Sequence, residues 1–158
     1  MSFKLGKVSL KNIDNISPYL KMIVKRAIDL TTVDFGIIHN GGYRTEEMQK
    51  EIFEAGNTKC DGVVKKSYHQ TGLAVDLVPY IDGRYTWSNK LAFIEIYKAF
   101  LRAENELKDK GYIPENVYFH HGIFWNWKDI DNDGEITISD KLGWDAAHHE
   151  QRTKKQKI

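Results

Sequence analysis

The chain has 158 residues, of which 41% are hydrophobic and 28% are charged, and these proportions exclude wholesale disorder. Its 23 basic and 22 acidic residues leave a net charge of +1, which gives no reason to expect nucleic acid as a partner. A chain of this length is most simply one domain around one hydrophobic core.

Cysteine content and hydropathy indicate where such a protein is made. The single cysteine, Cys60, excludes an intramolecular disulfide framework and a multi-cysteine zinc site. Residues 1–7 lack the apolar core of a signal peptide, and no apolar run is long enough to span a membrane. We therefore expect a monomer made in a cytosol, without a transmembrane segment.

Two helices and a strand are predicted in the first third of the chain. Ser17 and Pro18 suit the N-cap and first position of a helix over 18–30. Its buried stripe is expected to be Leu20, Ile23, Val24, Ala27 and Ile28. Residues 35–39 are predicted to form a strand, and Thr45 suits the N-cap of a second helix. The buried face of that second helix is predicted to be Met48, Ile52 and Phe53.

Arg44 lies at the corner between the predicted strand and the second helix. One interpretation is a salt bridge to Asp34 or Glu47. The other is a guanidinium that faces a cleft, where it clamps a substrate carboxylate or stabilises a tetrahedral oxyanion.

Asp76 lies in an apolar, β-branched run that predicts a buried strand. A buried carboxylate is normally paired, hydrogen-bonded or bound to a metal, because burying it alone is costly. His69 lies seven residues upstream, with Gly72 as a turn residue between them, so a loop that folds back can bring the two together. Both are zinc ligand types, and a catalytic zinc site uses three protein ligands and a water. For these two residues alone, the simpler interpretation is a loop histidine and an aspartate held by a backbone turn or an arginine.

The middle of the chain is predicted to supply scaffold and an aromatic strand. Asp82 and Gly83 indicate a tight turn, and Ser88 suits the N-cap of a long helix that ends at Gly111. Residues 118–127 are predicted to form a strand.

Within this predicted strand, His120 and His121 point to opposite faces, so at most one could bind a metal, and we place neither in the zinc site. Trp125 and Trp127 would share one face and are expected to form core or the wall of a cleft.

The segment 129–140 matches the EF-hand calcium loop. Acidic residues stand at loop positions one, three, five and twelve, and glycine stands at position six, where it permits the sharp turn. The expected oxygen ligands are Asp129, Asp131, Asp133, Glu135 and Asp140. Position twelve is aspartate rather than glutamate, and the preceding segment is strand-like rather than helical. The alternative is an acidic Asp-Gly turn without calcium.

The run Ser-x-His-x-x-Gly-x-Ala-x-Asp, which ends at Asp76, resembles the zinc signature of the D-alanyl-D-alanine peptidase and Hedgehog superfamily. That superfamily ends its site with an acidic residue, two spacers and a histidine, as in Asp145-Ala-Ala-His148 here. The resemblance implies that His69, Asp76 and His148 bind catalytic zinc and that Asp145 is the general base. It also implies that Arg44, in a Gly-aromatic-Arg-Thr element, faces the site.

Two assignments stay open within this resemblance. A shift of one residue in the alignment with the superfamily motif would make His149 the zinc ligand in place of His148. Glu150 competes with Asp145 as the general base or is a hydrogen-bond partner of the zinc ligands. Ser67 and Trp144, which lie within or beside the two motifs, are expected to contact substrate.

The opening Met-Ser-Phe-Lys-x-Gly-Lys and residues 79–87 resemble the L-alanyl-D-glutamate peptidases that serve tailed phages of Gram-negative hosts as endolysins. This implies a small α+β domain of the Hedgehog/D,D-peptidase type, with an antiparallel sheet packed against helices. It implies one catalytic Zn²⁺, regulatory or structural Ca²⁺, and peptidoglycan as substrate, reached from the host cytoplasm after the membrane is permeabilised. We expect the peptidase domain to span 1–150, with the calcium loop inserted at 129–140 and a basic, disordered tail over 151–158.

Three other functions remain open. A D-alanyl-D-alanine carboxypeptidase or dipeptidase would share every zinc residue and differ only in its substrate pocket. A calcium-dependent module that binds the cell wall would lack catalysis. A cysteine hydrolase would use Cys60, although no histidine adjoins it in the sequence.

Overall fold

The computed structural model describes residues 2–158 and has an α+β architecture, as the sequence predicts. Its helices are α1 (Lys7–Asn12), α2 (Pro18–Leu30), α3 (Glu46–Glu54) and α4 (Lys90–Asp109), with 3₁₀ turns η1 (Tyr68–Thr71) and η2 (Gly122–Phe124). Its strands are β1 (Phe35–Gly36), β2 (Ala74–Asp76), β3 (Val78–Ile81), β4 (Arg84–Tyr85), β5 (Tyr118–His121) and β6 (His148–Arg152). Two antiparallel sheets result, with strand orders β1-β3-β4 and β2-β6-β5.

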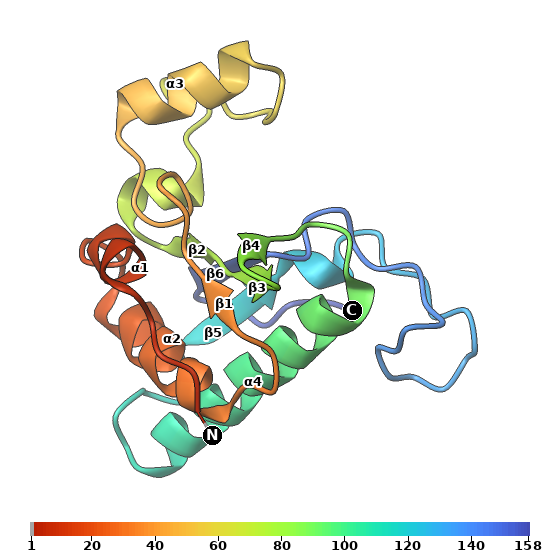
Figure 1. Cartoon of the computed structure of the whole chain (residues 1–158). Helices are drawn as coiled ribbons and strands as arrows, with labels where there is room; N and C mark the ends of the chain where they lie inside the picture. Colours follow the sequence, from red (N-terminus) through yellow and green to blue (C-terminus); the bar gives the residue numbers. More distant parts are fainter. Residues whose placement is uncertain (1) are drawn as a thin grey trace.

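The main core lies where α2 and α4 pack together beneath the sheets (Figure 1). The predicted stripe of α2 is buried along its whole length, and Ser17 Oγ caps the helix by accepting a hydrogen bond from the backbone N–H of Tyr19. The long helix is capped by Asn89 rather than by the predicted Ser88, because the Asn89 side chain accepts from the N–H of Ala92 at 3.0 Å.

The β2-β6-β5 sheet has one face toward α4 and one face that carries polar groups. On the α4 side, the Phe100 ring stacks on His149 with ring centroids 4.7 Å apart and contacts Phe119 and His121 edge-on. Side chains alternate along a strand, so the neighbours of His149 on β6, His148 and Glu150, point to the opposite face.

The helix α3 stands away from the rest of the molecule (Figure 1), and its predicted buried face is wrong. Phe53 is 42% exposed and Met48 and Ile52 are only half-buried, whereas Gln49 is fully buried. Among residues 2–158, neither hydrophobic core cluster includes a residue of this helix, so its packing is polar and centres on the Gln49 side chain.

Both predicted strands are shorter than expected. The first is limited to Phe35–Gly36, and the aromatic strand ends at His121. At Gly122 the chain turns and passes close to segment 143–145. A Cβ on residue 122 would lie 2.0 Å from the Asp145 carbonyl oxygen, so this close approach requires glycine. Trp125 and Trp127 therefore do not share a strand face.

The structure differs from the predicted domain boundary at residue 151, because β6 continues through Arg152 and the following residues contact β5. The Lys154 carbonyl accepts a hydrogen bond from His120 Nε2 at 2.6 Å. The Gln156 side chain accepts from the His121 N–H and donates to the His121 carbonyl. These bonds satisfy backbone groups at the outer edge of β5, which explains why the tail is held there.

Within residues 2–158, none of the helices combines the length and the apolar character that crossing a membrane requires.

Candidate active site

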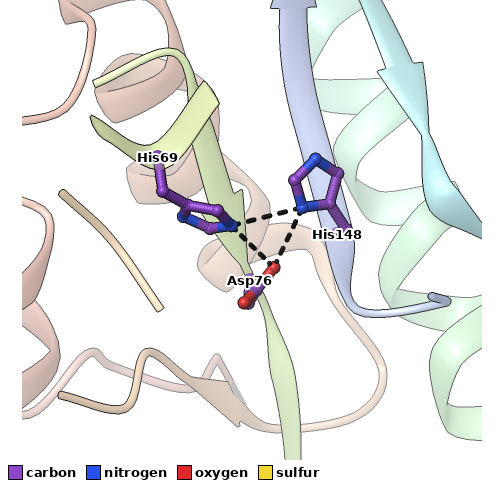
Figure 2. Close-up of side chains that lie close together, drawn as sticks. All are labelled: His69, Asp76 and His148. Carbon is purple, nitrogen blue, oxygen red and sulfur yellow. Dashed lines mark hydrogen bonds and ion pairs between the residues drawn. The ribbon is translucent and has the colours of Figure 1, made fainter. Parts of the chain in front are cut away.

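Three buried side chains converge from η1, β2 and β6 (Figure 2): His69, Asp76 and His148. His69 Nε2 and His148 Nδ1 lie 3.2 Å apart, and each lies 3.3 Å from Asp76 Oδ1. Asp76 and His148 are direct partners across the β2–β6 ladder, which places both on the polar face of the sheet. His69 reaches the same point because Gly72, in a left-handed conformation, ends η1 and turns the chain into β2.

The atom of each ligand that points away from the cluster is held by another group. His69 Nδ1 donates to the Gly42 carbonyl at 2.8 Å, and His148 Nε2 donates to Glu150 Oε1 at 2.7 Å. Asp76 Oδ2 accepts from Arg44 Nη2 at 3.2 Å. Each imidazole proton is thereby placed on the outer nitrogen, so the inner nitrogens can offer their lone pairs to one point.

This donor set fits a zinc ion. Tetrahedral zinc with bonds of about 2.0–2.1 Å places its ligand atoms about 3.3 Å apart, which is the separation found here. Asp76 Oδ1 is buried and has no hydrogen-bond partner among the described residues. A buried carboxylate oxygen faced by two imidazole nitrogens is well suited to a cation, and the three ligands leave a fourth position for water or substrate.

Asp76 gives the cluster a buried negative charge that a metal ion or a protonated histidine can balance. Burial by itself would raise the pKa of Asp76, but His69 and His148 hold that pKa well below its ordinary value. Burial lowers the pKa of His148, but the nearby carboxylates of Asp76, at 3.3 Å, and Glu150, at 2.7 Å, outweigh it and raise that pKa to about 10. A metal ion and the second proton of His148 would compete for the same place, so metal binding here is expected to release a proton.

Two carboxylates flank His148, and they lie on opposite sides of its ring. Asp145 Oδ2 lies 3.9 Å from Nδ1, the nitrogen that faces the cluster, and the Asp145 side chain remains partly exposed. Burial and repulsion from Asp76 raise the pKa of Asp145 to about 6, which suits a general base near neutral pH. Glu150 is 2% exposed and lies behind the ring, so the geometry favours Asp145 over Glu150 as the base.

The register of β6 separates His148 from His149. His149 faces α4, where its Nδ1 lies 2.8 Å from Nδ1 of His121. Of the adjacent pair, His148 is therefore the residue that joins the cluster. His120 and His121 lie outside it, as expected from the sequence.

Arg44 contacts neither Asp34 nor Glu47. It donates to the Asn40 carbonyl at 2.6 Å, to Gln49 Oε1 at 3.0 Å and to Asp76. Gln49 also donates to the Cys60 carbonyl at 2.8 Å, which ties α3 and its following loop to the cluster. These bonds make Arg44 a residue that orients Asp76. Sequence reasoning missed Gln49, because a polar residue on a helix is normally assigned to the solvent side.

The two expected substrate contacts differ in their surroundings. Ser67 Oγ caps η1 by accepting from the His69 N–H at 3.3 Å, so its described contact is structural. Trp144 is 70% exposed and packs on Trp125, whose ring centroid lies 5.0 Å from that of His148. A cavity of about 200 Å³ opens beside Asp145, and its lining includes Trp87, Phe93, Leu142 and Trp144.

The predicted calcium loop brings together three of its five expected ligands. Carboxylate oxygens of Asp129, Asp131 and Asp133 lie within 4.8 Å of one another, and Asp129 Oδ1 is buried with no hydrogen-bond partner among residues 2–158. Glu135 is exposed and lies outside this group.

Asp140 is buried, and its carboxylate is occupied within the loop. It accepts from the backbone N–H groups of Ile130 and Thr137, both at 2.9 Å, and from Trp127 Nε1 at 3.2 Å. Asp140 therefore holds the loop together in this structure instead of pointing into the acidic group.

Comparison with known proteins identifies the family of the chain. Residues 1–151 match the family model for phage L-alanyl-D-glutamate peptidase. The chain is 37% identical over 126 residues to the L-alanyl-D-glutamate peptidase of Escherichia phage T5, a match that covers 80% of this chain and 84% of that one. Its fold is similar to the crystal structure of the Serratia marcescens L-Ala D-Glu endopeptidase ChiX, with a TM-score of 0.67, 22% identity, and coverage of 96% of this chain and 91% of that one. The family model spans nearly the whole chain, including every residue of the cluster, and the chain therefore belongs to the phage L-alanyl-D-glutamate peptidase family.

Proposed function

We propose that this protein is a zinc-dependent endopeptidase that hydrolyses the L-alanyl-D-glutamate bond of peptidoglycan stem peptides. Its membership of the phage family supports the peptidase activity. The observation that carries the zinc assignment is the convergence of two imidazole nitrogens and one carboxylate oxygen at 3.2–3.3 Å, with the outer atom of each ligand already held.

In this proposal His69, Asp76 and His148 hold the ion. Bound zinc would lower the pKa of a water molecule and polarise the scissile carbonyl. Asp145, beside the open side of the cluster, takes a proton from the attacking water and returns it to the leaving amine. Arg44 keeps Asp76 oriented, a role that its three hydrogen bonds support better than direct contact with substrate.

We further propose that the loop 129–140 binds Ca²⁺ through Asp129, Asp131 and Asp133 and that this binding regulates or stabilises the peptidase. The loop is joined at its base by backbone hydrogen bonds between Lys128 and Lys141. In the sequence, this Lys128–Lys141 pair is separated from Asp145 by only three residues, Leu142, Gly143 and Trp144. Ordering the loop would therefore restrict the position of Asp145, the proposed general base.

Lys90, at the start of α4, donates a hydrogen bond to the Asp140 carbonyl and so attaches the loop to the scaffold. If calcium regulates activity, its affinity must differ between the active and inactive conformations, because a ligand with equal affinity for both shifts neither.

The biological role that fits this activity is host lysis. We propose that the protein acts as a monomeric endolysin that accumulates in the bacterial cytoplasm and reaches peptidoglycan after the membrane has been permeabilised. Low cytosolic calcium would then keep the enzyme inactive until lysis begins.

One experiment distinguishes the proposed activity from two alternatives, a D-alanyl-D-alanine peptidase and a non-catalytic module that binds the cell wall. Purified peptidoglycan is incubated with zinc-loaded protein, with and without calcium, and the released fragments are weighed by mass spectrometry. New L-alanine C-termini and D-glutamate N-termini support the proposed bond, whereas release of D-alanine supports a D-alanyl-D-alanine peptidase. Binding to the wall without any new amino groups would support a non-catalytic module.

The same assay tests the cysteine alternative. Insensitivity to a zinc chelator together with inactivation by thiol alkylation would indicate Cys60 as the nucleophile. The contacts of Cys60 are a backbone N–H that donates to Thr58 Oγ1 and a carbonyl that accepts from Gln49. Among the described residues, no histidine forms a hydrogen bond with it.

A further inference from the structure

The strand β6 carries three polar side chains on the face that holds the cluster: His148, Glu150 and Arg152. They form a bonded row. His148 donates to Glu150 Oε1 at 2.7 Å, and Glu150 Oε2 accepts from Arg152 Nε at 2.5 Å. The row therefore leads from the candidate metal position to a cation at the surface.

The Arg152 guanidinium is held on two sides and open on a third. Glu150 fixes its Nε edge, and the Tyr68 ring lies against its face, with Cζ 4.4 Å from the ring centroid. The Arg152 side chain is 38% exposed, and its Nη atoms form no hydrogen bond with any of residues 2–158. A guanidinium with its outer N–H groups free and its orientation fixed is suited to bind a carboxylate through two parallel hydrogen bonds.

The chemistry of the proposed substrate supplies such a carboxylate. A glutamyl residue has two carboxyl groups, and a linear chain continues through only one of them. The D-glutamate side of the scissile bond therefore carries at least one free carboxylate, whichever carboxyl group continues the chain.

The distance is compatible with this contact. Following the bonded row, an Arg152 Nη atom lies at most about 12 Å from His148 Nδ1, with ordinary bond lengths and hydrogen-bond distances. A free glutamyl carboxylate and the hydrogen bond to it reach about 7–10 Å from the attacked carbon, depending on which carboxyl group is free, and this lies within that limit. Arg44, the other arginine near the cluster, is an unsuitable partner because it is largely buried and already bonded to Asn40, Gln49 and Asp76.

We propose that Arg152, backed by Tyr68, binds the free carboxylate of the D-glutamyl residue and so sets both the direction of the substrate across the sheet and its preference for an acidic residue after the scissile bond. This inference rests on the proposed function. It assigns the end of β6 to the leaving-group side of the substrate.

Two synthetic N-acetyl-L-alanyl-D-glutamyl peptides test the proposal, identical except that the free glutamyl carboxyl is an acid in one and a primary amide in the other. We expect wild-type protein to cleave the acid with a kcat/KM about ten- to hundredfold above that of the amide, in line with a charged hydrogen-bonded pair. In Arg152→Gln this preference should disappear, because activity on the acid falls further than activity on the amide, which registers only the effect of Arg152 on Glu150 and His148.

The matched control is Arg102→Gln, which removes an exposed arginine from α4 and should keep the wild-type preference. Zinc content is measured for each protein to show that the cluster is intact. An equal loss on both peptides in Arg152→Gln would overturn the proposal and assign Arg152 to positioning Glu150 alone. An unchanged preference in that variant would also overturn it. If wild-type protein cleaves neither peptide, the proposed function itself fails, a result distinct from the other two.

Discussion

Replacement of Glu150 tests whether the group behind His148 controls metal affinity. Glu150 lies 2.7 Å from His148 Nε2 and is 2% exposed, so solvent screens this bond little. A hydrogen bond to a charged group contributes about 1.5–3 kcal/mol net, whereas a neutral one contributes about 0.5–1.5 kcal/mol. Glu150→Gln keeps an acceptor but loses the charge, so zinc affinity should fall about tenfold, since about 1.4 kcal/mol corresponds to a factor of ten.

Glu150→Ala should cost more, because it leaves the buried N–H of His148 without a partner. We expect a loss of about a hundredfold in zinc affinity, at the upper end of the effect of groups that hold metal ligands. Affinity is measured by competition with a chromogenic chelator at neutral pH, with Glu54→Gln, an exposed glutamate on α3, as the control. Wild-type affinity in both Glu150 variants would refute the reasoning that this bond orients His148.

Three further predictions follow from the same geometry. Asp145→Asn should keep zinc bound and lose about 10²- to 10⁴-fold in kcat, the range for removal of a general base, and near wild-type turnover by a zinc-loaded variant would contradict that role. Asp129→Asn should abolish the calcium binding measured by calorimetry and any rise in Tm when calcium is added. The control is Asp109→Asn, at the end of α4. Unchanged calcium binding by Asp129→Asn would exclude the loop as the site. Gly122→Ala should lower Tm and kcat together, because its Cβ would meet the Asp145 carbonyl oxygen at 2.0 Å, and a wild-type Tm would show that segment 143–145 moves freely.

The parts of the site that are local in sequence could be predicted from it. Asp76 in a buried strand and His69 behind a glycine turn are properties of one ten-residue segment, and the structure joins them as expected. The choice between His148 and His149 depends on which residue of β6 pairs with Asp76. That register is a tertiary property, since the two strands are far apart in the sequence.

Two features that the sequence did not reveal depend on polar groups that take the place of apolar ones in packing. On α3, apolar periodicity predicted a buried face, but the helix has no core to cover and is held by Gln49 instead. At the C-terminus, the basic composition predicted disorder, but bonds from His120 and His121 hold the tail. Gln49 bonds Cys60, 11 residues away, and the C-terminal residues bond β5, more than 30 residues away, so local composition could not reveal either set of contacts.

The bond pattern of Gln156 has a practical consequence for handling this protein. Its side-chain amide offers His121 one acceptor and one donor, as a neighbouring strand would, and so covers the outer edge of the β2-β6-β5 sheet at that residue. Strand borders without such cover are sites of pairing between molecules. We therefore expect that removing the last residues would expose the backbone groups of His121 at this edge to pairing with a second copy of the chain.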